Sequence, residues 1–203
     1  MGRLPRALAD ELLEYVRGLE YVHMHYRGQE LTARPKHVLR LRCPRAGYFY
    51  KYAWGQHNED YAQEHEVDAF PDVLQRAAVT VAGEGHTLNH VIITRYTRAE
   101  QHIPWHHDQQ DGAPSQHKSI AAGTTIYDVI VGGGEARHFQ MGKPDGDQEP
   151  IILFQRRLGH GRTVTLTAAG NAQLKHRVAT GDASKDQERF SIVFRTINSS
   201  PLV

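Results

Sequence analysis

The run Thr124-Thr125-Ile126-Tyr127-Asp128-Val129-Ile130-Val131 is the longest of several short β-branched and aromatic segments in the second half of the chain. Turn-forming residues bound each segment, and such regular spacing is typical of a β-sandwich or barrel. We therefore predict a mainly β fold with flanking helices and a jelly-roll core. The other segments are Val91-Ile92-Ile93, Ile151-Ile152-Leu153-Phe154, Thr163-Val164-Thr165-Leu166, Leu174-Lys175-His176-Arg177-Val178 and Ser191-Ile192-Val193-Phe194.

The N-terminal part of the chain has a different pattern. Leucines and valines recur at helical spacing from Pro5 to Val16, and a second short helix is expected from Pro71 to Val81. Between them, residues 38–54 alternate like strands and contain Pro44 and Gly47, which predicts a hairpin. These elements form an expected α/β cover for the β core.

Length and composition favour one folded domain. A chain of 203 residues with 39% hydrophobic residues can bury a sizeable core but is too short for two full-sized domains. We expect a single catalytic domain over residues 1–203, divided near residue 84 into the N-terminal cover (about 1–84) and the core (about 85–203). We also expect a monomer.

Other classes are excluded by what the sequence lacks. It has a single cysteine, Cys43, so a disulfide framework or a multi-cysteine metal site is excluded, and any metal must be held by histidine and carboxylate. No run approaches the roughly 18 apolar residues of a membrane span, and the first residues carry mixed charge. These features predict a soluble intracellular protein, cytoplasmic or nuclear, without membrane contact.

The candidate metal ligands lie in Trp105-His106-His107-Asp108 and in the later segment around His176. Residues two apart on a strand share a face, so His106 and Asp108 can converge on one ion. With His176 they form a two-histidine, one-carboxylate set, which leaves open positions on Fe(II) for a cosubstrate and dioxygen. Chance placement gives about 1.6 His-x-acid pairs in this composition, and two occur, so the spacing alone does not decide the matter.

Two arginines share one face of the last strand. In Arg189-Phe190-Ser191-Ile192-Val193-Phe194-Arg195, the phenylalanines and Ile192 point to the other face. Burial of arginine is costly without an anionic partner, and a small dicarboxylate matches the guanidinium fork. The alternative is a pair of rim arginines in surface salt bridges.

Six pieces of the chain, in order, resemble the motifs of one enzyme family. They are Asn89 with Thr94-Arg95-Tyr96, then Trp105-His106-His107-Asp108, Gly132 through Met141, Leu158-Gly159-His160-Gly161, Gln173 through Val178, and Arg189 through Thr196. The chain resembles the AlkB-like Fe(II)/2-oxoglutarate-dependent dioxygenases, most of all the animal members that repair alkylated bases. The resemblance covers about residues 85–196 and implies a double-stranded β-helix (jelly-roll) core with an N-terminal α/β substrate lid.

The resemblance also implies individual roles. His106, Asp108 and His176 match the family's catalytic metal ligands, so the cofactors would be Fe(II), 2-oxoglutarate and O2. The cosubstrate-binding positions that it implies are Arg189, Arg195, Tyr96 and Thr94. Thr94 departs from the family's usual asparagine, because its hydroxyl keeps the hydrogen bond but shortens the reach.

The upstream segment points to the substrate. Six basic residues and no acid lie between Leu31 and Asn58, a region that also carries Trp54, with Tyr61 shortly after it. The resemblance places Trp54 and Tyr61 in the lid, where aromatic faces would stack on a base while basic side chains contact phosphates. The alternative is that the tyrosines of this hairpin pack on the sandwich.

A departure follows the metal motif. Base-repairing members carry acids directly behind the metal aspartate, whereas this chain has Gln109 and Gln110 before Asp111. We assign Gln110 and Asp111 to substrate contact. Glutamine brings no charge to favour a cationic methylated base, so a neutral base or a substrate outside nucleic acid stays open.

The resulting hypothesis is oxidative demethylation of an N-alkylated base, in single-stranded or base-flipped DNA or RNA, with release of formaldehyde, succinate and CO2. One alternative is the same cofactor chemistry acting on a protein or a small molecule, which the near-zero net charge of +1 also favours. A second is a non-catalytic sandwich that binds metal without turnover.

Overall fold

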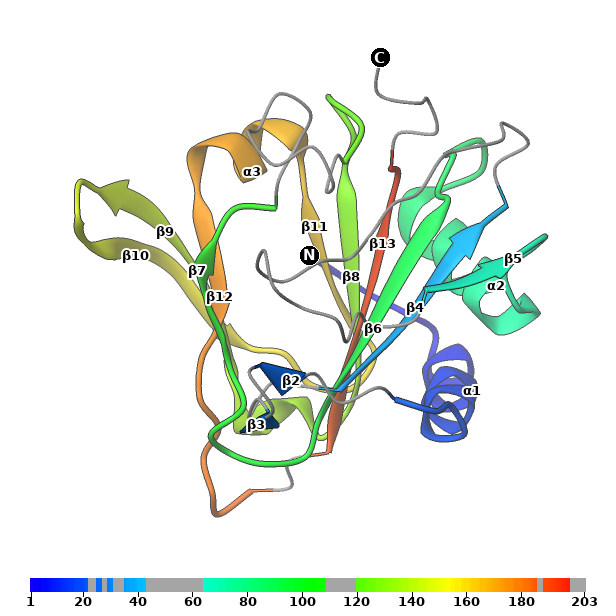
Figure 1. The fold of residues 1–203 in the computed structure, drawn as a ribbon, viewed down its shortest axis with the longest axis horizontal. Coiled ribbons are helices and arrows are strands. Elements are labelled where there is room, and N and C mark those ends of the chain that lie inside the picture. The colour runs from blue at the N-terminus through cyan, green and yellow to red at the C-terminus, as the bar shows by residue number, and fades with distance from the viewer. Residues whose placement is uncertain are drawn as a thin grey trace.

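Two β-sheets face each other in the computed structural model (Figure 1), which describes residues 1–21, 25–26, 29–30, 35–42, 64–108, 120–185 and 188–197. Among these residues the larger sheet has seven strands. From one edge to the other they are β1 (Gly2–Arg3), β11 (Arg162–Leu166), β8 (Ile126–Gly132), β13 (Arg189–Arg195), β6 (His90–Tyr96), β4 (Lys36–Leu41) and β5 (Glu64–Val67).

The smaller sheet carries the long hairpin that projects from the body in Figure 1. Its strands are, in spatial order, β10 (Gln148–Arg157), β9 (His138–Asp145), β12 (Lys175–Val178) and β7 (Ile103–His106). The strand pairs in both sheets are antiparallel except β4 with β5. The remaining elements are the short pair β2 (His25–Tyr26) and β3 (Gln29–Glu30), the helices α1 (Arg6–Arg17), α2 (Asp72–Ala82) and α3 (Ala168–Gln173), and the 3-10 turn η1 (Gly134–Ala136).

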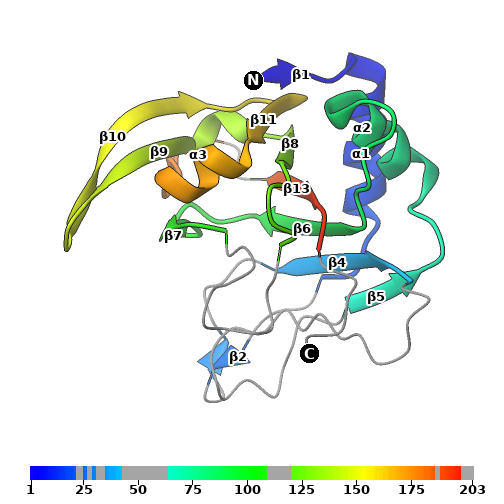
Figure 2. The ribbon, with the colours of Figure 1, turned by 90° about the horizontal axis from the view of Figure 1, so that it is seen from above.

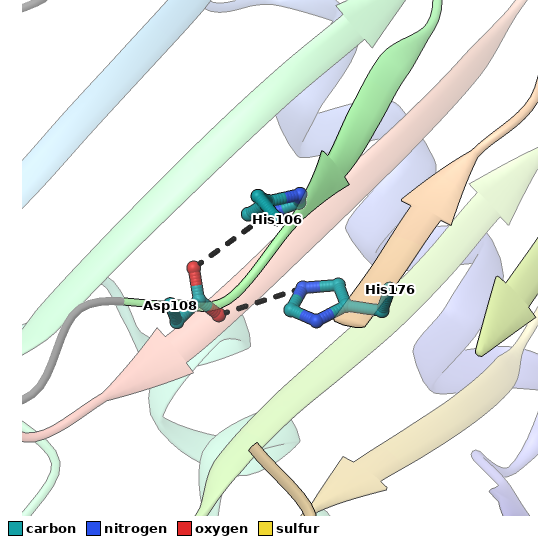
Figure 3. A group of neighbouring side chains, drawn as sticks. All are labelled: His106, Asp108 and His176. Carbon is teal, nitrogen blue, oxygen red and sulfur yellow. Dashed lines mark ion pairs between the residues drawn. The ribbon is translucent and has the colours of Figure 1, made fainter. Parts of the chain in front are cut away.

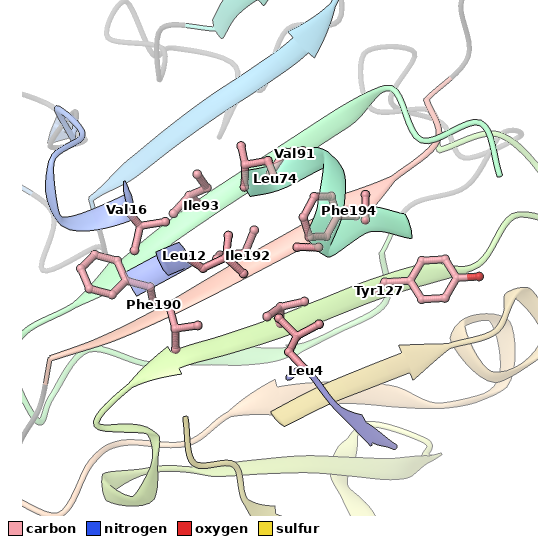
Figure 4. Close-up of a cluster of buried hydrophobic side chains, with 14 of the residues drawn as sticks. Leu4, Leu12, Val16, Leu74, Val91, Ile93, Tyr127, Phe190, Ile192 and Phe194 are labelled. Carbon is pink, nitrogen blue, oxygen red and sulfur yellow. The ribbon is translucent and has the colours of Figure 1, made fainter. Parts of the chain in front are cut away.

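The main hydrophobic core lies between the two longer helices and the outer face of the larger sheet (Figure 4). Leu12 and Val16 of α1 and Leu74 of α2 are fully buried there, against Ile192 and Phe194 of β13. Alternation along β13 sends these apolar residues outward to the helices and leaves the polar residues facing the smaller sheet. Figure 2 shows α1 and α2 on the side of the larger sheet that faces away from the smaller sheet.

A second, smaller core fills part of the space between the sheets. Its members come from both sheets and from the turn after β10, so it joins the two layers. The polar side chains of the same inner faces form the candidate site. The apolar members are Tyr96, Ile130, Phe139, Leu158, Val164 and Val178.

The predicted jelly-roll fold is confirmed, and the predicted segments from residue 91 onward coincide with β6, β8, β10, β11, β12 and β13. The two predicted helices begin and end within one residue of α1 and α2. The short helix α3 was not predicted.

The larger sheet includes strands from both sides of the boundary expected near residue 84. Backbone ladders pair β4 with β6 and β1 with β11, so the N-terminal segment supplies strands to the jelly roll itself. Helices α1 and α2 lie on the outer face and so do not cover the inner face as a lid would (Figure 2).

The hairpin expected over residues 38–54 is described only in its first strand. β4 ends at Leu41, and residues 43–63, which include the predicted lid residues Trp54 and Tyr61, lie outside the described residues. Among the residues that are described, no helix has both the length and the hydrophobicity needed to cross a membrane.

Candidate active site

Three predicted metal ligands meet on the inner face of the smaller sheet (Figure 3). His106 closes β7 and is the register partner of His176 on β12, while Asp108 follows β7 by two residues. The Nε2 atoms of His106 and His176 lie 3.8 and 3.7 Å from the two carboxylate oxygens of Asp108. One ligand atom from each residue lies within 4.8 Å of the others, close enough for a single ion to be bound by all three.

The protonation states of His176 and Asp108 suit a metal. His106 Nδ1 lies 2.9 Å from the Pro104 carbonyl, which leaves Nε2 free toward Asp108. Burial lowers the pKa of His176 to about 4, although Asp108 opposes the shift. Burial would raise the pKa of Asp108, but the electrostatic interactions of its carboxylate with His176, His106 and Arg195 outweigh burial and lower that pKa. Neutral imidazoles and an ionised carboxylate are the forms that coordinate metal ions.

A residue that the sequence did not reveal fixes the backbone of the metal carboxylate. Asn171 of α3 is 1% exposed, and its side-chain oxygen accepts a hydrogen bond from the Asp108 amide at 2.9 Å. Its Nδ2 donates to the Asp108 carbonyl at 2.7 Å, and its own carbonyl lies 2.7 Å from His107 Nδ1. No motif marks this asparagine, because the contact depends on how α3 packs against the residues after β7.

Arg189 is buried at the other side of the space between the sheets. It is 2% exposed, and its guanidinium carbon lies 4.9 Å from the centre of the fully buried Tyr96 ring. Its Nη1 atom is buried without a hydrogen-bond partner among the described residues. Because an unpartnered buried guanidinium N–H is costly, this donor fits a carboxylate such as that of 2-oxoglutarate.

The second predicted arginine, Arg195, is 5% exposed and lies six residues further along β13. Six residues of strand span about 20 Å, so two long arginine side chains can approach a small dicarboxylate from opposite ends. The Arg195 Nε donates to Nδ1 of the fully buried His90 at 3.0 Å. Burial, and then Arg195 and Arg40, hold the pKa of His90 well below its usual value, so this imidazole is neutral.

Thr94, the remaining predicted cosubstrate position, is 4% exposed and lies between Ser191 and Lys36 in the strand register. A half-buried acid that the sequence did not reveal faces the same space. Asp128 of β8 accepts a hydrogen bond from Ser191 Oγ at 2.7 Å. Burial raises the pKa of Asp128, while Arg189 and then the Ser191 hydrogen bond oppose that shift.

The structure does not describe the predicted substrate residues. Trp54, Tyr61, Gln110 and Asp111, and also Gln109, lie outside the described residues. Of the basic segment predicted to contact phosphate, β4 carries Lys36 and Arg40, which are 5% and 8% exposed. Lys36 is close enough to help lower the pKa of Asp108, and Arg40 donates to Glu66 at 2.6 Å.

A jelly roll with two histidines and one carboxylate grouped between its sheets has the donor set of the mononuclear non-haem iron oxygenases. The family comparison gives the same class, because the model of the 2OG-Fe(II) oxygenase superfamily matches residues 3–195. The chain therefore belongs to the 2OG-Fe(II) oxygenase superfamily, whose cofactors are Fe(II), 2-oxoglutarate and O2. A search of curated proteins finds no match.

Proposed function

We propose that this oxygenase is AlkB-like and removes N-linked methyl groups from bases of DNA or RNA. The observation that carries the proposal is that five of the six ordered motifs converge in space. The motif strands β6, β7, β9, β12 and β13 surround the space between the two sheets, and they carry the metal triad on one side and the buried arginines on the other.

The chain's own residues divide the work between the two sheets. His106, Asp108 and His176 would hold Fe(II), with Asn171 fixing the backbone at Asp108. Arg189 would take one carboxylate of 2-oxoglutarate through its unpartnered Nη1. Arg195, oriented by its bond to neutral His90, would face the other end.

Fe(II), once bound, supplies the activation of O2, for which the three protein ligands leave open coordination positions. In the net reaction one oxygen atom enters the N-methyl C–H bond and the other enters succinate, as 2-oxoglutarate loses CO2. The hydroxymethyl amine then breaks its C–N bond, releases formaldehyde and returns a proton to the base nitrogen. The pocket residues orient the substrate and exclude water.

Basic side chains near the triad support an anionic substrate. Lys36 lies within electrostatic reach of Asp108, and Lys36 and Arg40 are both on the inner face of β4, on the strand that leads into the predicted lid. Positive charge on this strand favours an anionic substrate such as a nucleic acid, whose backbone carries one negative charge per phosphate. We place the aromatic stacking contacts at Trp54 and Tyr61, and further base contacts at Gln110 and Asp111.

The test is an aerobic incubation with Fe(II), ascorbate, 2-oxoglutarate and a pool of N-methylated DNA and RNA oligonucleotides, following succinate and oligonucleotide mass together. We expect succinate together with a loss of 14 mass units, about one CH2, from at least one oligonucleotide. Succinate formation that no oligonucleotide increases would contradict the demethylase activity but agree with an oxygenase that acts on another substrate.

A second candidate is the same chemistry on a protein or small molecule, favoured by Gln109 and Gln110 in place of the acids that recognise a cationic base. Oligonucleotide binding separates the two candidates. Phosphate contacts release counterions, so the affinity of the demethylase for oligonucleotides must fall steeply with salt. Absence of binding even at low salt would favour the second candidate.

A further inference from the structure

The residues next to the two histidine ligands meet on the opposite face of the smaller sheet. Trp105 precedes His106 on β7, and Arg177 follows His176 on β12. Because side chains alternate along a strand, ligands that face the site place Trp105 and Arg177 on the outer face, directly behind it. Neither side chain has a role in the proposed reaction.

These two side chains form a network that crosses all four strands of the smaller sheet. The Arg177 guanidinium carbon lies 4.6 Å from the centre of the Trp105 ring. Arg177 Nε donates to the side-chain oxygen of Gln140 on β9. Glu149 of β10 accepts from Trp105 Nε1 at 2.6 Å and lies 3.4 Å from an Arg177 Nη1. We call Trp105, Arg177, Gln140 and Glu149 the outer-face clamp.

The backbone alone holds the two ligand strands weakly. The register between β7 and β12 shifts by one residue between the pairs His106–His176 and Ile103–Val178. Pro104, within this short stretch of β7, has no backbone N–H to donate to a ladder. A slip of one residue would turn an entire strand over and move His176 to the outer face. Side-chain contacts between the two strands therefore help to keep the strands in this register.

We propose that the outer-face clamp positions the metal ligands, so that Trp105 and Arg177 set the affinity of the site for its metal from the far side of the sheet. The inference rests on the proposed metal triad and is independent of the substrate. The stacked Arg177–Trp105 pair carries most of the effect, because Glu149 is 78% exposed and exposed ion pairs are weak.

The test is Mn(II) binding to the full chain without 2-oxoglutarate, followed by electron paramagnetic resonance, with Co(II) absorption as a report on ligand geometry. Arg177→Met removes both the stacked charge and the bond to Gln140, whereas Arg177→Lys keeps a positive charge. Trp105→Phe keeps an aromatic face for Arg177 but loses the indole N–H that donates to Glu149. The matched control is Arg157→Met on β10, an outer-face arginine whose hydrogen bond, 3.3 Å long, goes to His138.

We expect about tenfold weaker Mn(II) binding and an altered Co(II) spectrum for Arg177→Met, a smaller loss for Arg177→Lys and Trp105→Phe, and no change for Arg157→Met. Mn(II) affinity and a Co(II) spectrum equal to the wild type in folded Arg177→Met would overturn the clamp. Unchanged Mn(II) binding in His176→Ala would instead refute the metal site, and with it the role of the clamp.

Discussion

The two sheets of this oxygenase hold their functional side chains in different ways. The larger sheet carries Arg189 and Arg195 with an apolar face behind them, which α1 and α2 cover. The smaller sheet carries His106 and His176, and its outer face behind them is a network of polar and aromatic side chains partly open to solvent.

The difference teaches what each half of the site depends on. Burial of apolar area is strong and non-directional, so it fixes β13 as part of the core. A polar network is weaker in total but directional, and it can fix the register of two short strands. Mutations in the core behind the cosubstrate-binding arginines should therefore unfold the protein. Mutations behind the metal ligands can weaken metal binding in a protein that stays folded.

The largest effect is expected in the core behind the arginines. Phe194 is fully buried under the helices, so Phe194→Ala should lower the free energy of unfolding by about 3–5 kcal/mol. Urea unfolding of the apo protein measures this. Ile152→Ala on the projecting hairpin, where the side chain is 45% exposed, is the control and should change stability by less than about 0.5 kcal/mol. Similar losses of stability in both variants would contradict the proposed difference between the two sheets.

The second-largest effect is expected at Arg189 of the larger sheet. Arg189→Met should weaken 2-oxoglutarate binding by about 100-fold, or about 2.8 kcal/mol, because the cosubstrate carboxylate would be buried without its partner. Calorimetric titration with Mn(II) in place of iron measures the affinity. Arg189→Lys should recover part of it, and the exposed Arg162→Met on β11 should bind like the wild type. Full affinity in Arg189→Met would remove this residue from the cosubstrate pocket.

A smaller effect is expected from one added methyl group in the smaller sheet. A Cβ at Gly142 would lie 2.9 Å from Pro150 Cβ, 3.0 Å from the Ile151 carbonyl oxygen and 3.1 Å from the Trp105 ring. Gly142→Ala should therefore cost about 1–3 kcal/mol of stability and displace Trp105. Trp105 fluorescence and the Mn(II) affinity should change together. Gly18→Ala, at the end of α1, where φ is −78° and an added Cβ makes only ordinary contacts of 3.6 Å or more, tests for a general effect of glycine replacement. A wild-type Mn(II) affinity in Gly142→Ala would weaken the clamp.

The smallest effect is a pH slope from the larger sheet. Folding keeps His90 neutral, with its pKa well below 6.5, whereas the unfolded chain takes up a proton near 6.5. Acid therefore favours unfolding, and the contribution of His90 to stability is present above pH 6.5 and lost as the pH falls. His90→Gln keeps an acceptor for Arg195 and should flatten the decline of the urea midpoint between pH 7.5 and 5. An unchanged slope would contradict a neutral buried His90.

Period-two alternation was enough to predict that Arg189 and Arg195 share a face of β13, and it predicted that Asp108 lies beside His106, although Asp108 lies two residues beyond the end of β7. Those are local properties of one strand. The partnership of Asn171 with Asp108 and of Glu149 with Trp105 depends on strand order and register, which bring residues 63 and 44 positions apart into contact. The inward position of Asp128 was not predicted, because a single acid in a strand is normally interpreted as a solvent-facing residue. Its position is explained only by its hydrogen bond with Ser191 on the neighbouring strand. The same limitation hid the pairing of β4 with β6, which makes the N-terminal segment part of the sheet.

The most direct test of the account is succinate formation from 2-oxoglutarate under air with Fe(II), compared between the wild type and Asp108→Ala. The two proteins must first show the same circular dichroism and remain folded at the assay temperature. The account predicts that the wild type forms succinate and that Asp108→Ala forms none above the protein-free background. Equal succinate from both proteins would contradict the assignment of the metal centre to His106, Asp108 and His176.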